Sequence, residues 1–145
     1  MRRRRPWIET LVASIAGILA GCSILPTDEL AWRVVVGQVI GPEPAVEAPD
    51  SVAANTPFPI RVVTFGSSSC TRAAGVEVMP LNAVFSIVPK DSVLVGDVIC
   101  TQDLHAFPRE VEGSFPLPGK VVVAVSGRAG LADTVLYDTV IVVAQ

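Results

Sequence analysis

Short runs rich in valine and isoleucine recur along this chain, and proline, glycine or a polar cluster interrupts each run. β-Branched residues favour extended backbone, and the 12 prolines and 11 glycines supply many chain reversals. No stretch after Trp32 repeats apolar residues at the 3.6-residue period over the length of a helix. The pattern predicts an all-β domain of about seven strands, at 32–40, 57–65, 77–80, 83–89, 107–115, 120–128 and 134–143.

The strand spacing, about 8–14 residues, is typical of an antiparallel β-sandwich of the immunoglobulin-like type. Phe58, Ile60 and Val62 alternate with other residues, so they should share one buried face of a strand. A small open β-barrel is the alternative, because the pattern does not say whether the sheets close. We assign this domain to residues 32–145, with turns or loops predicted at 66–69, 90–97, 116–119 and 129–133.

The start of the chain is different in character. Four arginines, Arg2 to Arg5, precede an apolar run of about ten residues from Leu11 to Ala20, as in a secretory signal peptide. The run ends at Leu19-Ala20-Gly21-Cys22, which resembles the lipobox of bacterial lipoproteins. Two alternatives remain open, namely an uncleaved short anchor and ordinary signal cleavage.

The resemblance implies that residues 1–21 are removed and that Cys22 becomes a lipidated N-terminus. Several acyl chains hold a protein durably on a membrane, whereas one chain does so only marginally. Residues 22–31 would form a short polar tether, so the domain should sit close to the bilayer. Ser23 stands where an aspartate often retains such proteins at the inner membrane, so the outer membrane of the cell envelope is the predicted location.

Cleavage before Cys22 changes the charge of the chain. The full sequence carries −3, but loss of Arg2 to Arg5 and Glu9 leaves 7 basic and 13 acidic residues, a net charge of −6. Nucleic-acid binding requires a basic surface, and so does electrostatic docking on anionic lipid. The composition argues against both kinds of partner.

Three cysteines are present, and lipidation of Cys22 would leave Cys70 and Cys100 as a pair. An exported chain meets an oxidising compartment, so a disulfide between these two is the predicted state. A metal site is the alternative, with Asp103 and His105 as further ligands near Cys100. No second paired motif supports a metal, and we expect no cofactor.

Catalytic constellations are weakly represented. His105 is the only histidine, and no Gly-x-Ser-x-Gly elbow accompanies it, so we interpret it as a surface residue. Asp91, Asp97 and Asp103 are spaced six apart, which fits neither a calcium loop nor one strand face, and we interpret them as solvated loop acids. The loop 66–69 could cradle an anion, but no lysine or helix start follows it.

The stretches VAANTPFPIRVVTFGSSSCTR and GKVVVAVSGR, with the final valine-rich strand, resemble immunoglobulin-like envelope lipoproteins of bacteria. The likeness spans most of 34–143 and implies a fold without a residue-level function. The sequence therefore predicts a lipid-anchored, non-catalytic protein with a structural role or a protein or glycan partner. Its candidate surfaces are the region 90–105 and an exposed edge strand. A periplasmic small-ligand carrier is the alternative, and a hydrolase or metalloenzyme around His105 is a third reading.

Overall fold

The computed structural model describes residues 30–81 and 83–144. The lipobox, Cys22 and the first part of the predicted tether lie outside these residues. The described chain forms nine strands and no helix. The seven strands of six residues or more correspond to the seven strands that the sequence predicted. The strands are β1 (Ala31–Val36), β2 (Val46–Glu47), β3 (Ser51–Ala53), β4 (Phe58–Ser68), β5 (Thr71–Leu81), β6 (Val84–Val95), β7 (Gln102–Gly113), β8 (Gly119–Ala129) and β9 (Ala132–Val143).

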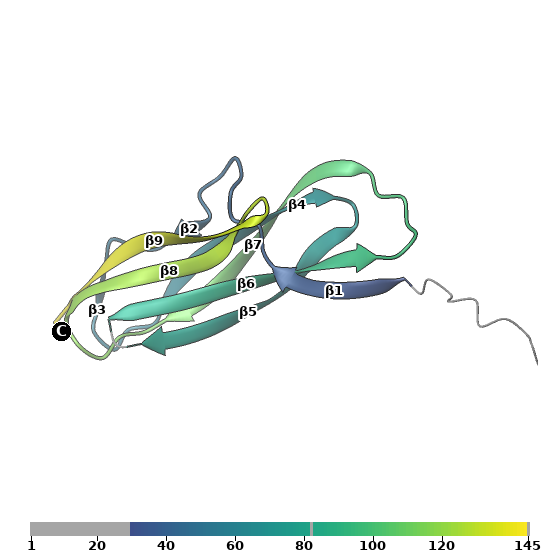
Figure 1. The fold of residues 1–145 in the computed structure, drawn as a ribbon. Coiled ribbons are helices and arrows are strands. Elements are labelled where there is room, and N and C mark those ends of the chain that lie inside the picture. The colour runs from purple at the N-terminus through teal and green to yellow at the C-terminus, as the bar shows by residue number, and fades with distance from the viewer. Residues whose placement is uncertain (1–29, 82, 145) are drawn as a thin grey trace, which may run out of the picture.

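The strands form two sheets that pack on each other (Figure 1). One sheet has the order β1-β6-β8-β9-β3, with β5 also paired to β6, and the other has the order β2-β4-β7. The β-sandwich prediction is confirmed. Most neighbours are antiparallel, but β6 pairs with β8 in parallel, and so does β3 with β9.

The core lies between the sheets and is built from alternating positions of the long strands. Phe58, Ile60 and Val62 of β4 are buried, as the alternation predicted. The same two-residue period buries Val121, Val123 and Val125 of β8. At one end of the core, the ring of Phe115 lies 5.7 Å from the rings of Phe58 and Phe85, measured between centroids.

Two predicted loops are strand. Gly66 to Ser68 continue β4 because they pair with the start of β7, with a bulge between them. The polar stretch from Lys90 to Val95 is not a turn, since β6 runs through it and each of its residues pairs with one residue of β1. Pairing with a distant strand decided both cases, and local composition does not show such pairing.

The chain at and after β1 forms backbone hydrogen bonds with two strands in turn, first with β6 and then with β8. After Val36 the chain donates a hydrogen bond from Gly37 N to the carbonyl of Pro89, at 2.9 Å. It then meets β8 through Val39 N and the carbonyl of Arg128, also at 2.9 Å. This crossing places residue 37 above the end of the core, where the candidate site lies.

Candidate functional site

The inward-facing rows of three strands change from apolar to polar toward the same end of the sandwich. In β4 the row Phe58, Ile60, Val62 continues to Thr64, which is fully buried. In β6 the buried row that includes Ile87 continues to Asp91. In β7 the residue two before buried Val111 is Arg109. Alternation alone therefore brings Thr64, Asp91 and Arg109 to one level between the sheets.

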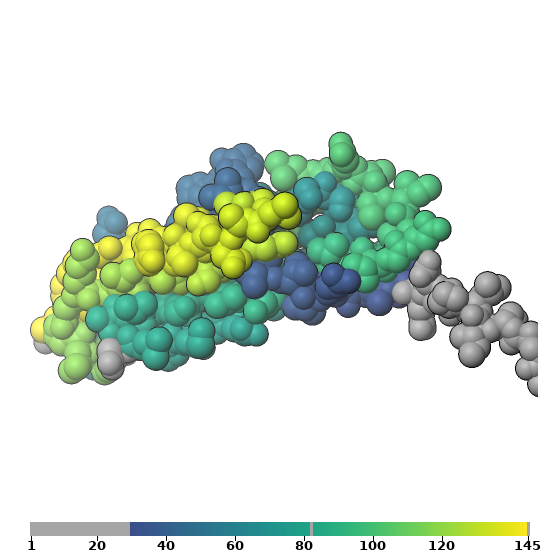
Figure 2. Space-filling model, viewed as in Figure 1, coloured from purple at the N-terminus to yellow at the C-terminus, as the bar shows by residue number. Residues whose placement is uncertain are grey.

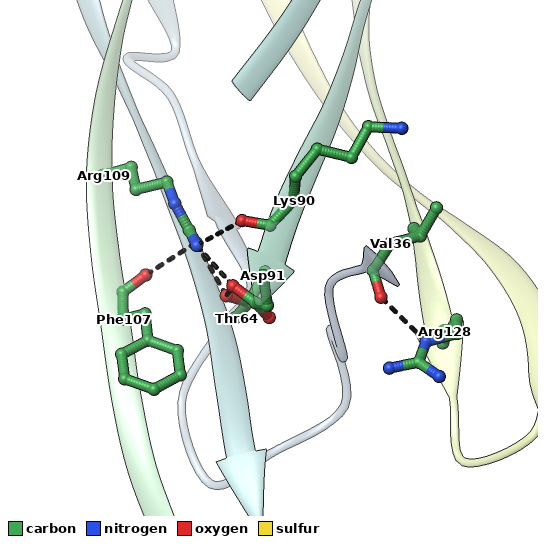
Figure 3. A network of polar contacts seen from close by, with 7 residues as sticks. All are labelled: Val36, Thr64, Lys90, Asp91, Phe107, Arg109 and Arg128. Carbon is green, nitrogen blue, oxygen red and sulfur yellow. Dashed lines mark hydrogen bonds and ion pairs between the residues drawn. The ribbon is translucent and has the colours of Figure 1, made fainter. Parts of the chain in front are cut away.

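These three side chains form a closed polar cluster (Figure 3). Arg109 donates from Nη1 to the hydroxyl of Thr64 at 2.6 Å and to the carbonyl of Phe107 at 3.1 Å. Its Nη2 donates to the carbonyl of Lys90 at 2.9 Å and to the carboxylate of Asp91. The Thr64 hydroxyl donates to the same Asp91 oxygen at 2.9 Å.

The ion pair between Asp91 and Arg109 is buried, since only 2% of the Asp91 side chain and 10% of the Arg109 side chain are exposed. A Cβ placed on Gly37 would lie 2.4 Å from Thr64 and 2.9 Å from Asp91, so the crossing chain seals the cluster. Among the described residues, every buried side-chain nitrogen and oxygen has a hydrogen-bond partner. The cluster therefore closes this end of the core with paired polar groups, and we call Thr64, Asp91 and Arg109 the plug.

The interpretation of Asp91 as a solvated loop acid is therefore wrong. Asp91 sits in β6 and faces the core, whereas Asp97 lies exposed in the loop after β6 and Asp103 lies exposed on β7. The structure does not bring the three carboxylates together. Arg109 and Thr64 are not among the predicted site residues, although each lies two residues from a core valine, Val111 and Val62, and so shares its strand face.

The predicted disulfide between Cys70 and Cys100 is confirmed, with their Cα atoms 5.6 Å apart. It joins the turn between β4 and β5 to the loop between β6 and β7. Backbone bonds surround it, because Leu94 N donates to the carbonyl of Cys70 at 2.9 Å and Ser69 N donates to the carbonyl of Thr101 at 3.1 Å. The bridge closes one end of the sandwich.

The bridge also weakens the metal hypothesis. Both thiols are committed to the disulfide, so neither is a free thiolate ligand. His105 Nε2 lies 2.8 Å from Asp103 Oδ2, and its ring stacks on Phe107 at 6.4 Å between centroids. Within the described residues, no group of three or more histidine, cysteine, aspartate or glutamate side chains is placed to hold a metal ion.

The stretch 66–69 does not form an anion cradle. Gly66 is buried in β4, and a Cβ placed there would lie 2.8 Å from the ring of Phe107. The amide of Ser69 already donates to the carbonyl of Thr101. The backbone groups of this stretch serve the disulfide end of the domain.

A shallow hollow of about 260 Å³ lies over β4 and β7, lined by Arg61, Pro108, Arg109 and Glu110. Arg61 donates hydrogen bonds to the carboxylates of Glu43 and Glu47, each at 3.0 Å. These bonds, with the one to Glu43 as the larger cause, raise the pKa of Arg61 above its ordinary value. A charged, open hollow differs from the apolar cavity that a small-ligand carrier needs. The geometry gives no support to that alternative.

Comparison with protein-family models, with curated proteins and with solved structures finds no match to this chain. No helix within residues 30–81 and 83–144 is long and apolar enough to cross a membrane.

Proposed function

We propose that this chain is a lipid-anchored protein of the bacterial cell envelope, held by acyl chains on Cys22, with a non-catalytic structural or binding role. The observation that carries the proposal is the order of the first 22 residues: four arginines, an apolar run and Leu19-Ala20-Gly21-Cys22. Ser23 favours the outer membrane over the inner one. The lipid, and not a protein helix, would provide the membrane attachment.

The disulfide supports export. A bridge between Cys70 and Cys100 persists in an oxidising compartment such as the periplasm and is rare in the cytosol. The net charge of −6 for the chain after Cys22 fits a soluble domain held near a membrane by lipid instead of by basic residues. The disulfide is an observation that does not depend on the lipobox.

A binding role is supported by an unpaired strand edge. Strand β5 has eleven residues, and in the described chain it pairs on one side with β6. Val78, Met79 and Leu81 of this strand are exposed. A free edge with exposed apolar side chains is suited to strand addition by an envelope protein, with side-chain contacts giving specificity. Pro80 limits such pairing, because it has no backbone N–H to donate.

The anchor is tested by Cys22→Ala. We expect this variant to incorporate no labelled palmitate, because the thiol that is acylated is missing. The mature membrane-bound form should therefore be absent. Fractionation of cells and palmitate labelling provide the measurements. Ser23→Ala is the matched control and should be lipidated as the native chain is. A Cys22→Ala protein that stays in the membrane as a processed form would contradict the proposal.

A further inference from the structure

The chain enters the sandwich at a definite end. Ala31, the first residue of β1, pairs with Val95, the last residue of β6. The loop from residue 96 to 101 follows Val95 directly and is tied to the turn between β4 and β5 by the disulfide. Figure 1 shows the start of β1 and this loop at the same end of the molecule. We call this the entry end.

Large apolar side chains are exposed at the entry end. The exposed fractions are 97% for Ile99, 61% for Leu104, 53% for Leu30 and 40% for Trp32. In Figure 2, the green atoms that follow β6 and the dark blue atoms of β1 form this end of the surface. The guanidinium carbon of Arg72 lies 3.7 Å from the centre of the Trp32 ring. Tryptophan beside arginine is a combination that suits a membrane interface.

The length of the tether restricts what the entry end can meet. Eight residues, 23–30, separate Cys22 from Ala31. Even fully extended, eight residues span at most about 28 Å. Lipid on Cys22 therefore keeps the entry end within a short distance of the bilayer surface, and no other end of the sandwich is held so closely.

Resting on the proposed function, we propose that the entry end docks on the lipid surface, with Ile99, Leu104 and Trp32 in the interfacial layer. The disulfide next to Ile99 holds the loop in place before docking, so docking costs little conformational entropy of the loop. Exposed charges near this end include both signs, from Arg33, Arg72, Asp97 and Asp103. Apolar insertion into a zwitterionic surface fits this balance better than attraction to anionic lipid does.

The mature chain supplies its own probe. The sequence holds two tryptophans, and Trp7 would leave with the signal peptide, so Trp32 would be the single tryptophan of the anchored protein. The lipidated protein is reconstituted into phosphatidylcholine vesicles that contain brominated acyl chains, which quench tryptophan only when it reaches the lipid. We expect Trp32 emission to fall by about half relative to vesicles without bromine.

Two further variants, both with Trp32→Phe, locate the contact. Ile99→Trp places the probe on the entry end, and Leu117→Trp places it on the loop before β8. That loop is at the opposite end, since Val122 of β8 pairs with Val84, the first residue of β6. Leu117 is 75% exposed, which makes it a matched control. Bromolipid should quench Ile99→Trp strongly and leave Leu117→Trp unchanged.

Equal quenching of the two variants, quenching of Leu117→Trp alone, or an unquenched Trp32 in the native chain would overturn the docking proposal. The mass of each reconstituted protein shows whether lipid is attached. A lipidated protein without quenching therefore refutes the docking alone, whereas a protein without lipid refutes the proposed anchor.

Discussion

Arg109→Met will lower the free energy of unfolding by about 3–5 kcal/mol, because it leaves the Asp91 carboxylate buried without its cation. The loss extends beyond one ion pair. Arg109 also donates to Thr64, to the carbonyl of Phe107 and to the carbonyl of Lys90. Methionine fills much of the same volume but donates no hydrogen bond. Urea denaturation followed by circular dichroism measures the change.

Arg61→Met is the matched control on the neighbouring strand. Arg61 binds Glu43 and Glu47 at the surface, where water replaces lost contacts, so its removal should change stability little. The double variant Asp91→Leu/Arg109→Met should recover part of the loss, since no charge stays buried, although the Thr64 hydroxyl then lacks its partners. If Arg109→Met were as mild as Arg61→Met, the plug would not stabilise the fold.

Loss of the disulfide is the second large effect expected. The double variant Cys70→Ser/Cys100→Ser should be less stable by about 3.5 kcal/mol, the chain-entropy value for a bridge between residues 30 apart. The bridge encloses a well-packed part of the domain. The hairpin that it encloses is the antiparallel pair β5 and β6, and Phe85 and Ile87 of β6 belong to the core.

Reduction provides the control for this variant. A reducing agent should lower the denaturation midpoint of the native chain to that of the double variant, and it should leave the variant itself unchanged. A native chain that is insensitive to reduction would show that the bridge contributes no stability.

Much of the fold was predictable because the long strands carry clear alternation. The alternation of Phe58, Ile60 and Val62 predicts one buried face, and all three side chains are buried. The even number of cysteines after Cys22 predicted the bridge. In both cases the information is local or depends on a simple count.

The plug was not predicted, because its meaning depends on distant partners. Lys90, Asp91 and Ser92 are polar and adjacent, which is typical of a turn. Here Asp91 is buried because Arg109, 18 residues later on the other sheet, neutralises it. A hydrophobic pattern ranks an aspartate as exposed whether or not such a partner exists.

The sequence pattern also could not predict the parallel pairing of β6 with β8. Consecutive strands usually neighbour each other, and here β7 is displaced to the other sheet while β8 returns beside β6. The short strands β2 and β3 lack the length that pattern analysis needs. The parallel pairing and the two short strands therefore depend on tertiary arrangement and not on local strand propensity.

The intact mass of the protein purified from membranes tests the central claim most directly. The account predicts a chain that begins at Cys22, carries the mass of attached acyl chains, and is lighter by two hydrogens for the bridge between Cys70 and Cys100. A chain that retains Met1, begins elsewhere or carries no lipid would contradict the proposal of an envelope lipoprotein.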